Sequence, residues 1–246
     1  MTIVDPRISI WTTSLLVIAI LVAALLLAAP LGTRAGLWNH EVGLQALLVV
    51  LIGGALTALM SVGTLMWTYK NKLAYARRSA ALSSVIALVP ALFVGMQIVT
   101  ARGLPMIHDI STDTVDPPVF ISPAIVDAKR ANTLEYGGIE IAKKQLVAYP
   151  NVKSITSGMP MATAFEHALE SATVLGWELV EKDPQAGRIE AVATTFWFGF
   201  KDDIAIRVRR EGTGSRVDLR SISRVGLSDI GANAARINAF INQFGS

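Results

Sequence analysis

The sequence predicts a three-helix transmembrane anchor followed by an α+β domain, a two-layer sandwich of a four-stranded antiparallel sheet with helices on one face. Three uncharged apolar stretches near the amino terminus predict the anchor. Beyond residue 158, a helical pattern, four alternating segments and a second helical pattern predict the sandwich. The expected divisions are 1–101 for the anchor, 102–158 for a polar connector with a weakly patterned lead-in, and 159–246 for the folded domain.

Charge is distributed unevenly along the 246 residues. The first 100 residues carry six basic and two acidic side chains, a net charge of +4, whereas residues 101–246 carry 16 basic and 17 acidic ones, a net charge of −1. The sequence pI of 9.3 therefore reflects the apolar half. Nucleic acid is not an expected partner, because the folded half lacks a basic run interleaved with aromatic residues. The absence of cysteine excludes disulfides, thiolate catalysis and cysteine-bound zinc.

The three apolar stretches are long enough to cross a bilayer. Residues 8–33, 42–69 and 79–101 contain no Asp, Glu, Lys or Arg. Each exceeds the roughly 20 residues that cross about 30 Å of hydrocarbon, and soluble helices seldom run so far without a charge. The first stretch is too long for a signal peptide and is expected to be retained. We expect spans at about 9–30, 43–68 and 80–100.

The loops between the spans predict the orientation. The loop between the first two spans carries only Arg34, opposed by Glu41. The positive-inside rule places the more basic connection between the second and third spans in the cytoplasm. The amino terminus is then cytoplasmic and the carboxy-terminal domain periplasmic, in a bacterial inner (plasma) membrane. The basic residues of that connection are Lys70, Lys72, Arg77 and Arg78.

The spans are expected to anchor the protein and not to transport a solute. They contain no ionisable side chain at depth, whereas transporters and pumps generally keep such groups there. Small residues recur at four-residue spacing, which lets helix backbones approach closely, either among these three spans or against a partner. These residues are Gly53, Thr57 and Ser61 in the second span and Ala87, Ala91 and Gly95 in the third.

The folded domain is predicted from alternating patterns. A helix over 160–175 and a last helix beginning at Ser228 enclose four strands, and short links between the strands favour an antiparallel meander. The alternation slips at 221–223, which predicts a bulge or a strand end. Alternating polarity predicts one dry and one solvated face, with the helices together on the dry one. The strands are expected at 177–181, 189–194, 204–209 and 217–220.

Two segments resemble a known family. The run Phe-Trp-Phe-Gly-Phe-Lys-Asp-Asp at 196–203 and the run Arg-Ser-Ile-Ser-Arg-Val-Gly-Leu-Ser-Asp-Ile-Gly-Ala-Asn at 220–233 are similar to the family called domain of unknown function 1499. The segment 108–120 also resembles the one that precedes this domain in multi-span bacterial members. The likeness covers roughly 105–244, although some members have a cysteine at the start of the domain and this chain has none. The resemblance implies domain boundaries and no reaction.

Eight polar residues form the candidate site. They offer paired carboxylates for acid–base chemistry or an arginine-lined anion pocket. The favoured interpretation is structural: Arg224 pairs with Asp202 or Asp203, and Ser228 and Asp229 cap the last helix. A hard-cation site in the segment 108–116 is the less favoured alternative to a connector, and no metal or cofactor is expected. The eight residues are Asp202, Asp203, Ser223, Arg224, Ser228, Asp229, Asn233 and Arg236.

An aromatic cluster is the candidate contact surface. It is expected to extend along a strand, so that some of its side chains lie outside the core; the open alternative is that they pack in the core or against the membrane surface. The function that fits these features is a non-catalytic interaction module or accessory subunit of a membrane complex, with membrane lipid and other membrane or periplasmic proteins as partners. The alternatives are an envelope hydrolase that uses Asp202 or Asp203, and a module that binds lipid or a small ligand between sheet and helices. The cluster consists of Phe196, Trp197, Phe198 and Phe200.

Overall fold

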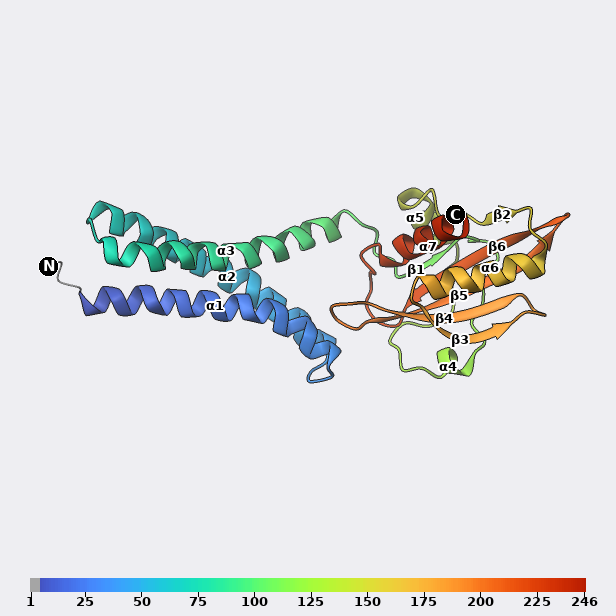
Figure 1. Cartoon of the computed structure of the whole chain (residues 1–246), viewed down its shortest axis with the longest axis horizontal. Helices are drawn as coiled ribbons and strands as arrows, with labels where there is room; N and C mark the ends of the chain where they lie inside the picture. Colours follow the sequence, from blue (N-terminus) through green and yellow to red (C-terminus); the bar gives the residue numbers. More distant parts are fainter. Residues whose placement is uncertain (1–4) are drawn as a thin grey trace. The chain divides into compact units, whose positions relative to one another are not determined.

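The computed structural model describes residues 5–246, which divide into two compact units. One unit contains the described residues up to Arg102 together with Trp197–Gly199, and the other contains Gly103–Phe196 and Phe200–Ser246. The first is helical, and the second is built around a sheet (Figure 1).

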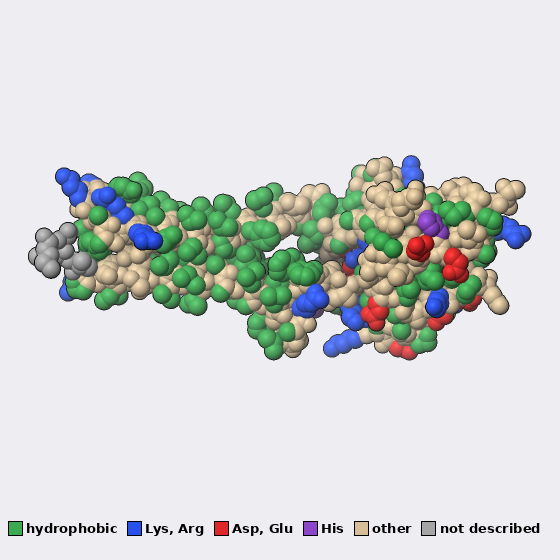
Figure 2. Space-filling view, in the orientation of Figure 1, with side chains coloured by type: hydrophobic (Ala, Val, Ile, Leu, Met, Phe, Trp, Pro, Cys, Tyr) green, Lys and Arg blue, Asp and Glu red, His purple; other side chains and the backbone are tan. Residues whose placement is uncertain are grey.

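The helical unit contains three long helices, α1 (Pro6–Arg34), α2 (His40–Lys70) and α3 (Ala74–Arg102). All three are long and apolar enough to cross a membrane, which confirms the three predicted apolar helices. Their surface carries many exposed apolar side chains (Figure 2). Soluble proteins rarely expose so many apolar side chains together, because contact between apolar surface and water is unfavourable. The helices therefore suit a lipid environment.

Small residues bring α2 and α3 together. A Cβ atom on Gly54 would lie 2.8 Å from the carbonyl oxygen of Ala87 and 3.0 Å from Cβ of Ala91, so only glycine fits there without a shift. Of the small residues predicted at four-residue spacing, Thr57, Ser61, Ala87 and Ala91 are buried, and Gly53 and Gly95 are partly buried.

The folded unit has a six-stranded antiparallel sheet, so the predicted count of four is wrong. Its strand order is β1-β6-β5-β4-β3, and β2 also pairs with β6. The strands are β1 (Asp109–Ser111), β2 (Ile155–Ser157), β3 (Glu178–Asp183), β4 (Arg188–Thr194), β5 (Lys201–Glu211) and β6 (Gly214–Ser223).

The two additional strands share one edge of β6. β1 pairs with 220–222 and β2 with 215–217, so the two short strands lie end to end along the ten residues of β6. Each has only three residues, too few to show alternation in the sequence. Both lie within the segment 102–158, which also contains α4 (Pro123–Val126) and α5 (Gly138–Ala148).

One hydrophobic core lies between the sheet and two helices, α6 (Met161–Val174) and α7 (Ala232–Phe244) (Figure 1). Alternate residues of β4, β5 and β6 contribute to it, and we call their side of the sheet the helix face. Buried Phe165 of α6 and Phe240 of α7 fill the layer.

The segment 112–136 covers the opposite side of the sheet, which we call the loop face. Its backbone N–H groups at Ile121 and Ser122 donate to the Glu190 carboxylate of β4 at 2.8 and 3.1 Å. Glu190 and Asp218 are fully buried, and Arg220 is 2% exposed. The prediction of a solvated face is wrong for most of its charged residues, because the covering segment contacts them, although the Arg209 side chain remains 40% exposed.

Candidate functional site

Asp202 and Asp203 are neighbours in β5, so their side chains point to opposite faces of the sheet. Asp202 shares the helix face with Ile204, and Asp203 shares the loop face with Ala205. The predicted polar cluster is therefore split into two networks by the sheet itself.

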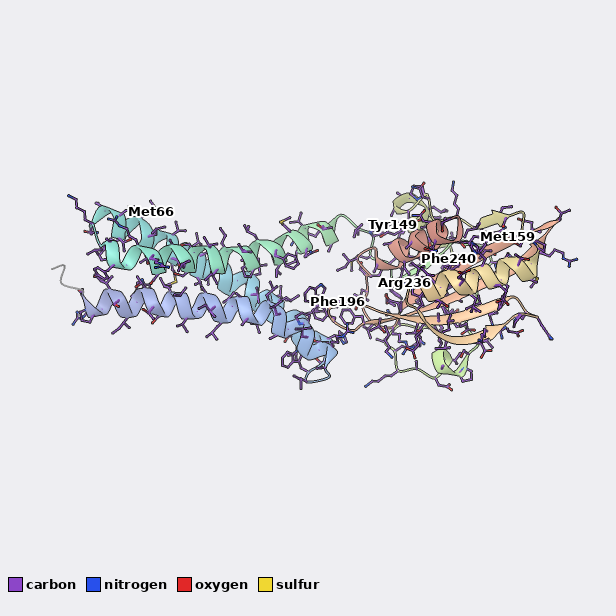
Figure 3. All side chains as sticks on the ribbon, in the orientation of Figure 1. Met66, Tyr149, Met159, Phe196, Arg236 and Phe240 are labelled. Atoms are coloured by element: carbon purple, nitrogen blue, oxygen red, sulfur yellow. The ribbon has the colours of Figure 1, made fainter. Side chains whose placement is uncertain are left out.

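The Asp202 network lies on the helix face and contains Asp202, Ser221, Ser223, Asn233 and Arg236. Nη2 of Arg236 lies 2.6 Å from Oδ2 of Asp202, and Nη1 donates to Oγ of Ser221 at 3.0 Å. Ser221 donates to Oδ1 of Asn233 at 2.7 Å, and Nδ2 of Asn233 donates to Oγ of Ser223 at 3.0 Å. Arg236 also donates to Oδ1 of Asn233. Figure 3 shows Arg236 and Phe240 on α7, so one helix carries both the polar and the apolar contacts.

This network explains the break in the alternation at the end of β6. Ser223 pairs with Asp202 and Ser221 with Ile204, so β6 keeps its register with β5 and has no bulge at 221–223. The strand ends at Ser223, which agrees with the predicted strand end in this range. The two serines point to the helix face although they are polar. Their hydroxyl groups are hydrogen-bonded to α7, which offsets the cost of burying them.

Burial raises the pKa of the Asp202 carboxyl above its ordinary value, although Arg236 and Ser223 act in the opposite direction. A raised pKa is a property of catalytic acids. Here, however, the carboxylate is engaged by the Arg236 guanidinium and is only 2% exposed. A cavity of about 660 Å³ lies elsewhere in this unit, along α6 at Glu166, His167 and Glu170.

Asp229 organises the start of α7. Its Oδ1 accepts from the backbone N–H of Gly231 and its Oδ2 from that of Asn233, both at 2.9 Å. Ile230 (φ 53) and Gly231 (φ 79) have left-handed backbone conformations, which turn the chain into the helix. Ser228 accepts from the N–H of Ile230 at 3.3 Å. α7 begins at Ala232, later than the start predicted at Ser228, because this turn comes first.

The Asp203 network lies on the loop face. Arg224 binds the Asp203 carboxylate with Nε at 3.0 Å and Nη2 at 2.7 Å, the fork geometry of strong arginine–carboxylate pairs. Arg130, from the covering segment, lies 3.0 Å from the same carboxylate. The backbone N–H of Ala131 donates to the carbonyl of Arg224 at 2.8 Å. Asp203 thus ties both the end of β6 and the covering segment to the sheet.

A second aspartate–arginine network lies further along the loop face. Asp218 of β6 is fully buried, and hydrogen bonds from Arg207 and Arg209 of β5 reach its Oδ2 at 3.1 and 2.9 Å. Asp113 and Asp116 of the covering segment bind arginines of the same group. Asp113 and Asp116 were two of the carboxylates that the alternative cation site in 108–116 would need, and both are paired with arginine here. The whole aspartate–arginine network is Asp113, Asp116, Asp218, Arg207, Arg209 and Arg216.

The pKa of Asp218 reflects these partners. Burial alone raises the pKa, but hydrogen bonds from Ser154, Arg216 and Arg207 outweigh it, so the pKa of the Asp218 carboxyl lies below its ordinary value. Oγ of Ser154 donates to Oδ1 of Asp218 at 2.5 Å. Asp218 is therefore held as a carboxylate, which is the ionised form that three arginines require.

Arg220 is the most enclosed cation of the loop face. Its guanidinium binds the Asp109 carboxylate at 2.7 and 3.0 Å and lies between the rings of Phe120 and Tyr136, at 5.2 and 5.4 Å from their centroids. Burial and the Asp109 charge raise the pKa of Tyr136 to about 12. Burial also raises the pKa of Asp109, against the influence of Arg220. The first strand of the domain is held to β6 by this ion pair.

The aromatic cluster lies in the loop between β4 and β5 and not along a strand. Thr195 and Phe200 close this loop, because the N–H of each donates to an oxygen of the other, at 2.8 and 2.9 Å. Phe196 is 72% exposed and Trp197 50%, whereas Phe198 and Phe200 are half-buried. Of the predicted contact residues, Phe196 and Trp197 present the largest apolar surface.

Three enclosed charged residues near the candidate site were not predicted as contacts of the sheet. Arg130, Glu190 and Arg220 are buried or nearly so, and all three form part of the contact between sheet and covering segment. For Glu190 and Arg220 the signal in the sequence was a charged residue at an outward position of a predicted strand; Arg130 lies in the predicted connector. Alternation alone does not show whether water or a protein segment meets such charges.

The structure defines a class of protein in which helices suited to a membrane precede an α+β domain with a buried aspartate–arginine pair on each face of its sheet. The family model described as "Protein of unknown function (DUF1499)" matches residues 109–244. The chain belongs to this family, as the resemblance at 196–203 and 220–233 implied. No curated protein matches the chain. The match begins at the first residue of β1, so the family domain includes the covering segment.

Proposed function

We propose that this protein is a non-catalytic interaction module, anchored in the bacterial inner membrane with its folded domain in the periplasm, and that it serves as an accessory subunit of a membrane complex. The observation that carries this proposal is the pairing of both candidate carboxylates. Asp202 is bound by Arg236, and Asp203 by Arg224 and Arg130, on opposite faces of one sheet. Two carboxylates separated in this way do not act together on one substrate.

The distribution of basic residues supports the periplasmic location. The connection between α2 and α3 and the turns beside it carry Lys70, Lys72, Arg77 and Arg78. The connection between α1 and α2 has a single basic residue near it, Arg34. Positive-inside logic keeps the more basic connection in the cytoplasm, and the end of α3 then leads into the periplasm.

Two adjacent loops of the folded unit supply the contact surface. Phe196 lies in the loop after β4, and Leu227 and Ile230 lie in the loop after β6, with exposed fractions of 72%, 74% and 56%. The N–H of Arg224 donates to the carbonyl of Lys201 at 3.1 Å, which holds the bases of the two loops together. Exposed apolar side chains on ordered loops are typical of protein contact sites.

Site-specific photocrosslinking tests this proposal. A photoreactive amino acid is introduced at Phe196 or at Leu227 in the full chain, and the matched control carries it at Val174 of α6, which is 61% exposed. We expect discrete crosslinked products, with a second membrane protein or a second copy of this chain, from the two loop positions and not from position 174. Uncrosslinked monomer at all three positions, or equal products from all three, would contradict the proposal.

A further inference from the structure

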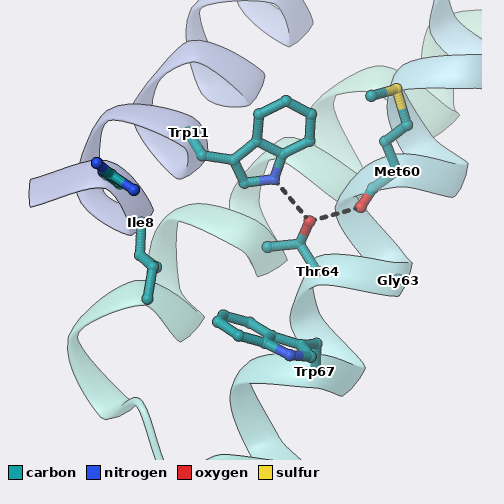
Figure 4. A pocket seen from close by; sticks show the side chains of 7 residues that line it. Ile8, Trp11, Met60, Gly63, Thr64 and Trp67 are labelled. Carbon is teal, nitrogen blue, oxygen red and sulfur yellow. Dashed lines mark hydrogen bonds between the residues drawn. The ribbon is translucent and has the colours of Figure 1, made fainter. Parts of the chain in front are cut away.

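A groove is present in the helical unit between the first turns of α1 and the last turns of α2 (Figure 4). Its volume is about 490 Å³. Helix α2 contributes residues at helical spacing, so that one face of this helix forms one wall, and α1 forms the other. The lining residues are Arg7, Ile8, Trp11, Met60, Gly63, Thr64 and Trp67.

A hydrogen bond between α1 and α2 shapes the groove, and a glycine leaves space in it. Nε1 of Trp11 donates to Oγ1 of Thr64 at 3.0 Å, and Thr64 donates to the carbonyl of Met60 at 2.8 Å, which fixes the Trp11 indole as a wall (Figure 4). A Cβ atom on Gly63 would meet nothing within 4 Å. The floor of the groove is therefore open because residue 63 has no side chain.

The end of the helical unit that contains the groove is strongly basic. Arg7 lines the groove, and Lys70 is one turn beyond Trp67, about 5 Å along the helix axis. Lys72 follows in the adjoining connection, and Arg77 and Arg78 in the first turns of α3. Asp5 is the acidic residue nearest to Arg7 in the sequence, and it is engaged in capping α1 through the N–H of Arg7.

We propose that this groove binds an anionic phospholipid. One acyl chain lies over Gly63 between Trp11 and Trp67, and the phosphate group lies at the level of Arg7 and the basic connection. Tryptophan is enriched where the hydrocarbon meets the headgroups, and basic residues beside a span attract anionic lipids. In the orientation proposed above, the lipid belongs to the cytoplasmic leaflet.

Charge complementarity favours an anionic phospholipid as the occupant of the groove. The groove joins an apolar floor to a cationic rim, which matches a molecule with an apolar tail and an anionic head. A partner helix would fill the floor but leave the basic rim without a counter-charge. A zwitterionic phospholipid would satisfy the floor and gain less from the rim, because its net charge is zero.

Quenching by brominated lipids tests the proposal. The full chain is reconstituted in vesicles of mixed phosphatidylglycerol and phosphatidylcholine, with the bromines on the acyl chains of one lipid or the other. The groove signal is the quenching that is lost when both Trp11 and Trp67 are replaced by Phe. We expect brominated phosphatidylglycerol to give the same groove signal at about fivefold lower mole fraction than brominated phosphatidylcholine, as one favourable lipid–arginine contact implies.

Two variants separate the charge from the shape of the groove. Arg7→Gln is expected to bring the ratio between the two lipids close to one, and Arg102→Gln, the same change at the end of α3, to leave it unchanged. Gly63→Leu is expected to reduce the quenching by both lipids, because its side chain fills the floor, whereas Val62→Leu on the same helix does not line the groove.

Three results would overturn the proposal. The first is a ratio near one for the unmodified protein. The second is an effect of Arg7→Gln and Gly63→Leu no larger than that of their controls. The third is protection of Trp11 and Trp67 from quenching by both lipids that grows with the ratio of protein to lipid. That result would assign the groove to a second copy of the chain. Vesicles with symmetric leaflets make the result independent of the orientation and of the proposed periplasmic function.

Discussion

At the scale of single residues, the side-chain alternation of a strand decides what Asp202 and Asp203 do. The adjacent carboxylates are separated by the thickness of the sheet, and each meets an arginine from a different element. Asp202 holds α7 to the sheet, and Asp203 holds the covering segment and the loop after β6. We propose that these two carboxylates stabilise the fold by these pairs.

Replacement of Asp203 tests this role. Asp203→Asn leaves Arg224 and Arg130 without their shared buried carboxylate, and we expect the free energy of unfolding to fall by about 3–5 kcal/mol. Urea unfolding of the detergent-solubilised protein measures it. Asp127→Asn, an exposed position of the same covering segment, is the control and should change stability by less than about 0.5 kcal/mol. A loss at Asp203 no greater than in this control would refute the structural role.

The pKa of Asp218 makes a prediction for acid stability. Because the pKa is lower in the folded protein than its ordinary value of about 3.9, the carboxylate stabilises the fold above about pH 4, and this contribution is lost as the pH falls through the folded-state pKa. We expect Asp218→Asn to lower stability at neutral pH and to reduce the decline of stability below about pH 4. Unfolding midpoints measured from pH 2 to pH 7 check both effects.

The raised pKa values of Asp109, Glu190 and Asp202 act in the opposite sense, since they lower stability as the pH rises. These residues are present in both the variant and the parent, so the difference between the two proteins isolates Asp218. Parallel curves for the two proteins below pH 4 would contradict the lowered pKa.

At the scale of elements, the covering segment 112–136 is the principal departure from a simple two-layer sandwich. It contains one short helix, α4, and depends on pairs with strand residues for its position. Its attachment is polar, through the aspartate–arginine network, the Glu190 hydrogen bonds and Arg130. Segments attached by such partly exposed pairs open more readily than a hydrophobic core.

Limited proteolysis tests how the segment is held. In the double variant Asp113→Asn, Asp116→Asn, the three arginines keep Asp218, but Arg207 and Arg209 lose both carboxylates of the segment and Arg216 loses Asp113. We expect cleavage within 112–136 at protease concentrations that leave the parent protein intact, while the sheet remains resistant. Asp127→Asn serves as the control. Equal cleavage of the parent and the double variant would show that other contacts hold the segment.

The longer elements of the folded unit were predictable from periodicity. The expected helix at 160–175 corresponds to α6, and the four expected strands correspond to β3 to β6. β1 and β2 were not predictable, because strands of three residues are too short to have a measurable period. The face expected to be solvated was also misjudged, since Asp113 and Asp116 contact Arg207 across more than 90 positions of sequence. Such a contact is a tertiary property that local patterns do not contain.

At the scale of the whole molecule, the three apolar helices and the family domain were both predictable from sequence. Long uncharged stretches have few explanations other than a membrane, and the family match starts at β1. The candidate site was predictable as a set of residues but not as two networks, because its division depends on the strand register. The proposed function rests further on the orientation, which four basic residues in one connection predict.

Cysteine labelling tests that orientation most directly, because the chain contains no cysteine of its own. One variant carries Val115→Cys, at a position that is 94% exposed in the folded domain, and the other carries Asn71→Cys in the connection between α2 and α3. Spheroplasts are treated with a membrane-impermeant maleimide before and after lysis. We predict that position 115 is labelled in intact spheroplasts and position 71 only after lysis; labelling of position 71 alone before lysis would place the folded domain in the cytoplasm and contradict the proposed function.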